Sequence, residues 1–125
     1  MKKSGVFLGW LLVLATAPAV AVDTTNFEVK TSRDLVALCS TSASDPLYHA
    51  AMGYCLGYVD GAHDYHLSIT SGELLKPIAC HGPEVTRQQV VDVFLAWSRN
   101  NDSLLDKEAP IHGLMRAVSA KWPCK

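Results

Sequence analysis

A charge excess of either sign is missing from this 125-residue sequence, in which 11 Lys and Arg face 12 Asp and Glu. A nucleic-acid-binding domain typically carries a basic stripe, and runs of like charge mark interaction tails or membrane-surface patches. Neither pattern occurs, so the sequence predicts no nucleic-acid partner and no binding to a membrane surface.

Familiar catalytic and cofactor motifs are missing too. The sequence has no nucleophile elbow, no H-E-x-x-H pair, no P-loop and no glycine-rich dinucleotide fingerprint. We therefore predict that the protein is not an enzyme and that it has no catalytic residue, no cofactor and no metal site.

A long hydrophobic run occurs only at the start of the chain. Two lysines stand in the first three residues, residues 6–14 are apolar, and an A-x-A pattern ends at Ala21, which together are typical of a secretory signal peptide. The alternative, an uncleaved membrane anchor, is disfavoured because a membrane span needs about 20 apolar residues. We predict a signal peptide over residues 1–21, cleavage after Ala21, and a single domain over residues 22–125 outside the cytoplasm.

The sequence lacks a C-x-x-C pair, although it contains four cysteines: Cys39, Cys55, Cys80 and Cys124. Their spacings of 15, 24 and 43 intervening residues do not fit a zinc site. An even number of cysteines in a small exported domain is typical of a disulfide framework. We therefore predict that all four are oxidised.

Strand-like alternation is also absent, whereas apolar residues recur at helical spacing in several segments. The predicted fold class is all-α, a small disulfide-bonded bundle of about four helices. An extended, loosely packed leader is expected before the first helix, and a long irregular stretch after the second. The expected helices cover residues 31–39, 46 to about 67, 86 to about 99 and 108 to about 122; the leader is 22–30 and the irregular stretch 68–85.

Capping residues support these helix starts. Thr31 with Asp34, and Thr86 with Gln89, fit the reciprocal capping box. Asp45 fits an N-cap because a proline follows it, and proline is well suited to the first helical position.

Three glycines, Gly53, Gly57 and Gly61, recur every fourth residue in the second expected helix and therefore share one face. Each costs the helix roughly 1 kcal/mol relative to alanine. We interpret them as helix-packing glycines that let another helix of the same chain approach closely. The alternative is a contact surface for a partner.

The order of the helices favours one of the three possible disulfide pairings. The last two helices are joined by a short connection and are expected to be antiparallel neighbours. This arrangement brings Cys80, before the third helix, close to Cys124, after the fourth. We therefore predict the pairs Cys39–Cys55 and Cys80–Cys124.

One polar cluster lies in the second expected helix: Asp60, His63, Asp64 and His66. A carboxylate beside imidazoles is able to bind zinc or move a proton. A solvated face opposite the apolar stripe is the favoured interpretation. The remaining histidines are isolated in the sequence: His49, His81 and His112.

Three short motifs occur in a fixed order: C-L-G-Y-V-D-G from Cys55, C-H-G-P-E-V-T from Cys80, and W-P-C ending at Cys124. With the leucine-containing helix that ends in Cys39, they resemble the Rap/Tai family of type VI secretion amidase immunity proteins. That family shows C-x-G-Y-[IV]-x-G, C-x-P-x-G-[VI]-T and F-P-C. The chain departs from this pattern at Trp122 and in the exchanged order of glycine and proline after Cys80.

The resemblance implies a periplasmic, often dimeric helical protein that binds a secreted peptidoglycan amidase toxin and occludes its active-site cleft with a protruding surface. We expect Tyr65 as an aromatic anchor at that surface, with Glu73, Lys76 and His81 as further partner-binding residues. The alternative function is a periplasmic stress or chaperone-type binding protein. The least favoured hypothesis is an enzyme that acts through the Asp60–His66 cluster.

Overall fold

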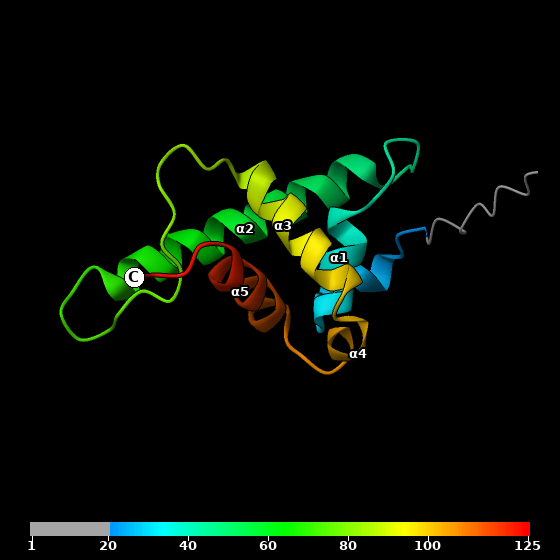
Figure 1. Cartoon of the computed structure of the whole chain (residues 1–125). Coiled ribbons are helices and arrows are strands. Elements are labelled where there is room, and N and C mark those ends of the chain that lie inside the picture. Colours follow the sequence, from blue (N-terminus) through cyan, green and yellow to red (C-terminus); the bar gives the residue numbers. More distant parts are fainter. Residues whose placement is uncertain (1–20) are drawn as a thin grey trace, which may run out of the picture.

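The computed structural model describes residues 21–125, so the predicted signal peptide lies outside the described residues except for Ala21. The described chain contains no strand, which confirms the predicted all-α, disulfide-bonded bundle (Figure 1). Over the same range, no helix combines the length and the hydrophobicity that a membrane span requires. The elements are the 3-10 helix η1 (Thr24–Glu28), α1 (Ser32–Cys39), α2 (Tyr48–Thr70), α3 (Arg87–Arg99), α4 (Asp102–Leu105) and α5 (Pro110–Lys121).

The segment before α1 is folded, so the predicted extended leader is wrong. The Asp23 carboxylate accepts the Thr25 N–H at 2.7 Å, and the Asn26 side chain accepts the Asp23 N–H at 2.8 Å. These reciprocal caps close η1, and they bring Val22 into the core and Phe27 against it. Short polar side chains thus stabilise a turn that hydrophobic periodicity does not reveal.

Helix α1 begins with the predicted capping box. The Thr31 hydroxyl accepts the Asp34 N–H, and the Asp34 carboxylate accepts the Thr31 N–H at 2.9 Å. Asp34 also accepts hydrogen bonds from the Asn26 side chain and the Lys30 N–H, both at 3.0 Å. One carboxylate therefore joins the start of α1 to η1.

Helix α2 begins at Tyr48 instead of the predicted Pro46, because Asp45 closes a turn before the helix. The Asp45 carboxylate accepts the Leu47 N–H at 2.8 Å, and its backbone carbonyl accepts the Tyr48 N–H at 3.0 Å. The helix continues to Thr70, beyond its expected end. Its 23 residues make it about 35 Å long at 1.5 Å per residue, much longer than α3 or α5.

Helices α3 and α5 start at the expected places. Thr86 and Gln89 form the predicted capping box, and Pro110 occupies the first turn of α5. The connection between them contains the short helix α4, which was not predicted. This turn buries Leu105, which is 3% exposed, and apolar burial explains why a largely polar connection is helical there.

The core lies where α1, α3 and α5 meet, around the fully buried ring of Phe94. Helix α5 passes close to α1 at Gly113, where an added Cβ would lie 3.0 Å from the Ser32 Cβ and 3.3 Å from the Trp97 ring. The buried Ser32 hydroxyl donates to the Ala109 carbonyl at 3.0 Å. Gly113 is therefore the glycine that allows two helices to approach closely.

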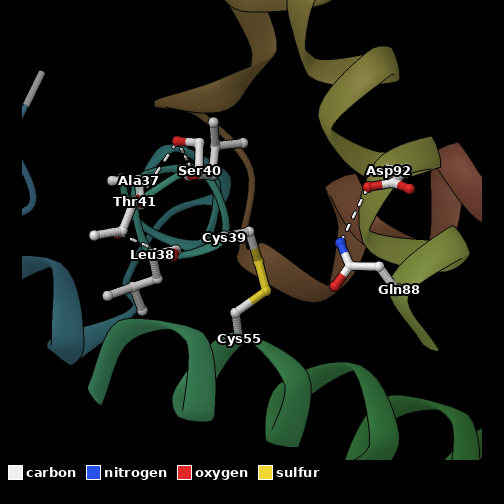
Figure 2. Close-up of a disulfide and its surroundings, with 9 residues drawn as sticks. Ala37, Leu38, Cys39, Ser40, Thr41, Cys55, Gln88 and Asp92 are labelled. Carbon is white, nitrogen blue, oxygen red and sulfur yellow. Dashed lines mark hydrogen bonds between the residues drawn. A yellow bond between two sulfur atoms is a disulfide. The ribbon is translucent and has the colours of Figure 1, made fainter. Parts of the chain in front are cut away.

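The predicted disulfide pairing is confirmed. Cys39 pairs with Cys55 and Cys80 pairs with Cys124, with Cα–Cα distances of 5.1 and 4.9 Å. Figure 2 shows the first bridge joining the end of α1 to α2, beside the loop that starts with Ser40. Loops of these sizes gain about 3–4 kcal/mol each from closure in the chain-entropy model.

The glycine row of α2 does not pack against another helix, so the interpretation as intramolecular helix-packing glycines is wrong. Gly53, Gly57 and Gly61 are exposed, and a Cβ on any of them would meet no atom of the described chain within 4 Å. The buried residues of α2, namely Ala51, Cys55 and Val59, lie on the opposite face. The alternative, a contact surface for a partner, stays a prediction.

Candidate functional site

Exposed apolar side chains are concentrated at one end of the molecule. Within residues 21–125, six of the seven large apolar residues that are exposed belong to the last part of α2 and the loop after it, and Tyr54 is the seventh. Leu74 is 97% exposed and Tyr65 is 68% exposed. We call these six residues the apolar tip: Tyr65, Leu67, Ile69, Leu74, Leu75 and Ile78.

The tip is exposed because α2 is longer than the helices it packs against. All the buried residues of α2 lie between Ala51 and Val59. Beyond them the helix continues past α3 and α5, and the loop projects from its far end (Figure 1). Ala62 still packs against the core, but Tyr65, Leu67 and Ile69 farther along α2 are exposed.

The loop is attached at its base and not along its length. Residues 72–77 make no hydrogen bond to any other part of the described chain. The Ile78 N–H donates to His66 Nε2 at 3.2 Å, which ties the loop back to α2. Next, the Cys80 N–H donates to the Trp122 carbonyl at 2.8 Å, and Cys80 is bonded to Cys124.

A cavity of about 170 Å³ lies beneath the tip, between α2, the loop base, α3 and α5. Its walls are mainly apolar, with Val59 and Ala62 from α2 and Leu114, Met115 and Val118 from α5. Polar side chains also line it: Asp60, His63, His66, His81 and Arg87.

Three histidines meet at this cavity, although only two of them are close in the sequence. The rings of His63 and His81 stack with centroids 5.2 Å apart, and His81 meets Trp122 edge-on at 5.4 Å. Burial, helped by the neighbouring His63 and His81, lowers the pKa of His66 below its usual value. His81 is therefore part of a cluster, and its isolation in the sequence is misleading.

The cluster of Asp60, His63, Asp64 and His66 does not form one site. Asp60 accepts a hydrogen bond from Arg87 of α3 at 2.7 Å, and Asp64 is exposed near His63, with Oδ1 3.7 Å from Nδ1. Across residues 21–125, no group of three or more His, Cys, Asp or Glu side chains is arranged to hold a metal ion. Asp60 is therefore part of an ion pair with Arg87. His63 and His66 instead form, with His81, what we call the histidine cluster.

The four predicted partner-binding residues fall into two places. Tyr65, Glu73 and Lys76 are exposed at the tip, while His81 is half-buried at the cavity. Their role in binding stays a prediction. The aliphatic residues of the tip were not among the predicted partner-binding residues. Leu74 and Leu75 were nevertheless a signal, because they lie in an irregular stretch where no helical stripe continues to bury them.

A family model described as Rap1a immunity proteins matches residues 31–124, which is more than half of the chain. The matched range runs from the N-cap of α1 to the last cysteine, so it contains both disulfides, the apolar tip and the histidine cluster. Neither a curated protein nor a solved structure matches the chain significantly.

Proposed function

The chain belongs to the Rap1a immunity protein family, and we propose that it protects the cell by binding a type VI cell-wall amidase in the periplasm. In this proposal the apolar tip enters the active-site cleft of the amidase and excludes its peptidoglycan substrate. The protein acts by binding and takes no part in bond-making chemistry.

The observation that carries this proposal is the concentration of exposed apolar residues on a projecting element. Soluble proteins rarely expose large contiguous apolar patches unless the patch binds something. Substrate clefts are concave and mostly apolar, so a convex apolar element has the complementary shape. Leu74, at 97% exposed, is the side chain most available to enter such a cleft.

The tip also has a firm base, which an occluding inhibitor requires. Cys80–Cys124 and the hydrogen bond from Cys80 to Trp122 join the loop to the end of α5. Restricting a binding element before it meets its partner lowers the entropy lost on binding. Tyr65 then supplies a large side chain with few rotatable bonds, and Glu73 and Lys76 supply a polar rim.

Two further observations support the periplasm as the site of action. All the cysteines of the described chain are in disulfides, and disulfides persist in oxidising compartments such as the periplasm. The N-terminal residues have the pattern of a secretory signal peptide.

The proposal is tested with a panel of purified type VI cell-wall amidases, using peptidoglycan hydrolysis and calorimetry as readouts. We expect the oxidised protein to inhibit at least one of them, and the double variant Leu74→Asp/Leu75→Asp to bind it at least about 30-fold more weakly, because buried anchors at an interface contribute about 2 kcal/mol or more each. Both side chains are exposed, so the variant should unfold at the same temperature as wild type.

The matched control is Ala96→Asp/Ala120→Asp, which adds the same charge at exposed positions on α3 and α5. This control should inhibit like wild type. Equal weakening by both double variants would indicate a charge effect and not a tip contact. Failure to inhibit any amidase of the panel would remove the proposed partner class.

The same exposed tip gives a second candidate function, a chaperone-type protein that binds unfolded clients through apolar side chains. Such a protein would suppress aggregation of chemically unrelated clients, and Leu74→Asp/Leu75→Asp would abolish that protection. A specific inhibitor would leave client aggregation unchanged while it inhibits an amidase. Light scattering of a heat-denatured client separates the two functions.

A further inference from the structure

The loop part of the apolar tip, which carries Leu74, Leu75 and Ile78, is held against α2 by a histidine. Thr70 and Ser71 direct their hydroxyls to carbonyls of α2 itself. The Ile78 N–H bond to His66 Nε2, at 3.2 Å, is therefore the one hydrogen bond within residues 21–125 that ties residues 72–79 to α2.

This hydrogen bond requires neutral His66. A neutral imidazole has one acceptor nitrogen, whereas an imidazolium carries a proton on both nitrogens and accepts nothing. Protonation of Nε2 would therefore remove the bond and place an N–H group against the N–H of Ile78. The Ile78 backbone is exposed, so water is available to take over its donor.

The surroundings of His66 offer no anion to hold the charged form. From α2 it faces His63 and Asp60, from the loop base His81, and from α3 Arg87. Asp60 is already paired with Arg87 at 2.7 Å. The face of α5 toward this cavity is apolar and contributes no titratable group: Leu114, Met115 and Val118.

We propose that His66 is a proton-operated latch: when neutral it fixes the base of the loop that carries Leu74, Leu75 and Ile78 to α2, and when protonated it releases that loop. Burial and the neighbouring His63 and His81 lower the pKa of His66, so the latch stays closed at neutral pH and opens below the ordinary histidine value of about 6.5. The latch itself is a property of the isolated chain. Only its consequence, weaker amidase binding in mildly acidic conditions, rests on the proposed function.

The latch is tested on the full oxidised chain by nuclear magnetic resonance, from about pH 8 to about pH 5, the range in which histidine titrates. The imidazole nitrogen shifts report the protonation of His66, and hydrogen exchange, corrected for the intrinsic rate, reports the protection of the Ile78 amide. We expect that protection to fall about tenfold as His66 titrates, the change expected for loss of one hydrogen bond. The Cys80 amide, which donates to the Trp122 carbonyl, should keep its protection.

Variants make the assignment specific. His66→Gln places an acceptor that does not titrate on the same helix turn, so protection of the Ile78 amide should become independent of pH. His66→Ala should lose that protection at every pH. His112→Gln, an exposed position on α5, should keep the wild-type profile.

Two results would overturn the latch: Ile78 protection that stays constant while His66 titrates, or a wild-type profile in His66→Gln. These results do not depend on a partner. If the latch titrates as expected but no amidase binds at any pH, the latch stands and the proposed function fails. If an amidase binds at neutral pH while Ile78 protection is flat, the latch fails alone.

Discussion

Apolar side chains are buried at one end of the molecule and exposed at the other. At the crossing of α1, α3 and α5, Phe94 is completely buried, whereas Leu74 at the tip is 97% exposed. Burying a large apolar side chain contributes about 1.5–3 kcal/mol, so a chain of this size forgoes stability at the tip. The difference indicates that the core supports the fold and that the tip is available for binding.

Helix α2 connects the two ends. Its first half is held by Ala51, Cys55 and Val59, and Cys55 is bonded to Cys39 of α1. Its second half carries Tyr65 into solvent. A continuous helix transmits the position of the packed end to the tip, so rigidity at the core is useful for binding at the other end.

The largest effect should come from removing a ring from the core. Phe94→Ala should lower the free energy of unfolding by about 3–5 kcal/mol, because it removes buried surface and leaves a cavity. Leu74→Ala should change it by less than about 0.5 kcal/mol, the usual size for an exposed position. Urea titration of both oxidised variants measures the two values on one scale.

A loss of more than about 1 kcal/mol in Leu74→Ala would break the comparison, since it would show that the tip contributes to folding. The matched control is Val91→Ala beside Phe94, where a smaller buried side chain should cost less than the ring but more than Leu74.

Much of the packed end could be predicted from the sequence because its signals are local. Thr31 and Thr86 each precede a partner three residues later, and the cap forms wherever the helix lies. The disulfide pairing followed from helix order alone, since short connections leave few arrangements. Asp45 was misassigned because the same side chain fits an N-cap or a turn before a helix, and only packing decides between them.

The tip and the histidine cluster could not be predicted in the same way, because their exposure depends on which segments pack over them, and the sequence alone does not specify this. Leu74 and Leu75 would be ordinary core residues if another helix lay over them. The exposed glycine row was predictable in principle. Gly57 is two positions from Cys55, which is about 200° around a helix, so the glycines had to face away from the apolar stripe. The position of His81 near Trp122 could likewise have been predicted, since the predicted Cys80–Cys124 bond brings their neighbours together.

Alanine substitutions at two helical glycines should have opposite signs. Gly113→Ala should cost about 1–3 kcal/mol, because the new methyl group meets Ser32 and Trp97 at the helix crossing. Gly57→Ala should gain about 1 kcal/mol, because its Cβ would enter open space and alanine is the better helix former. Thermal unfolding of both variants at the same pH measures the difference.

Sedimentation of the Gly57→Ala variant sharpens the result. A stabilised variant with the association state of wild type would show that the row is not a self-contact surface. A wild-type dimer that becomes monomeric in Gly57→Ala would assign the row to the predicted homodimer. Destabilisation by Gly57→Ala would contradict the open environment of the glycines.

The smallest predicted effect is a pH dependence of folding stability that arises at the packed end, from Asp34. Burial raises the pKa of the Asp34 carboxyl, but hydrogen bonds from Asn26, Thr31 and Lys30 together outweigh it and hold the pKa below its usual value. A carboxyl with a lowered folded-state pKa contributes stability above its unfolded value of about 3.9 and loses it as the pH falls through the folded value. Asp34→Asn should therefore cost about 1 kcal/mol near pH 7, the size of a helix cap, and progressively less as the pH falls through the folded-state pKa of Asp34.

The control Asp92→Asn, at an exposed position on α3, should leave the acid profile of wild type unchanged. Far-ultraviolet circular dichroism during urea unfolding follows the packed end, and protection of the Ile78 amide follows the tip. Because His66 titrates below about pH 6.5 and Asp34 only below about pH 3.9, we expect a range between the two titrations in which the loop of the tip is released while the helices remain folded. Simultaneous loss of both signals would mean that the core and the tip unfold as one unit, and the distinction between a supporting end and a binding end would then have no dynamic basis.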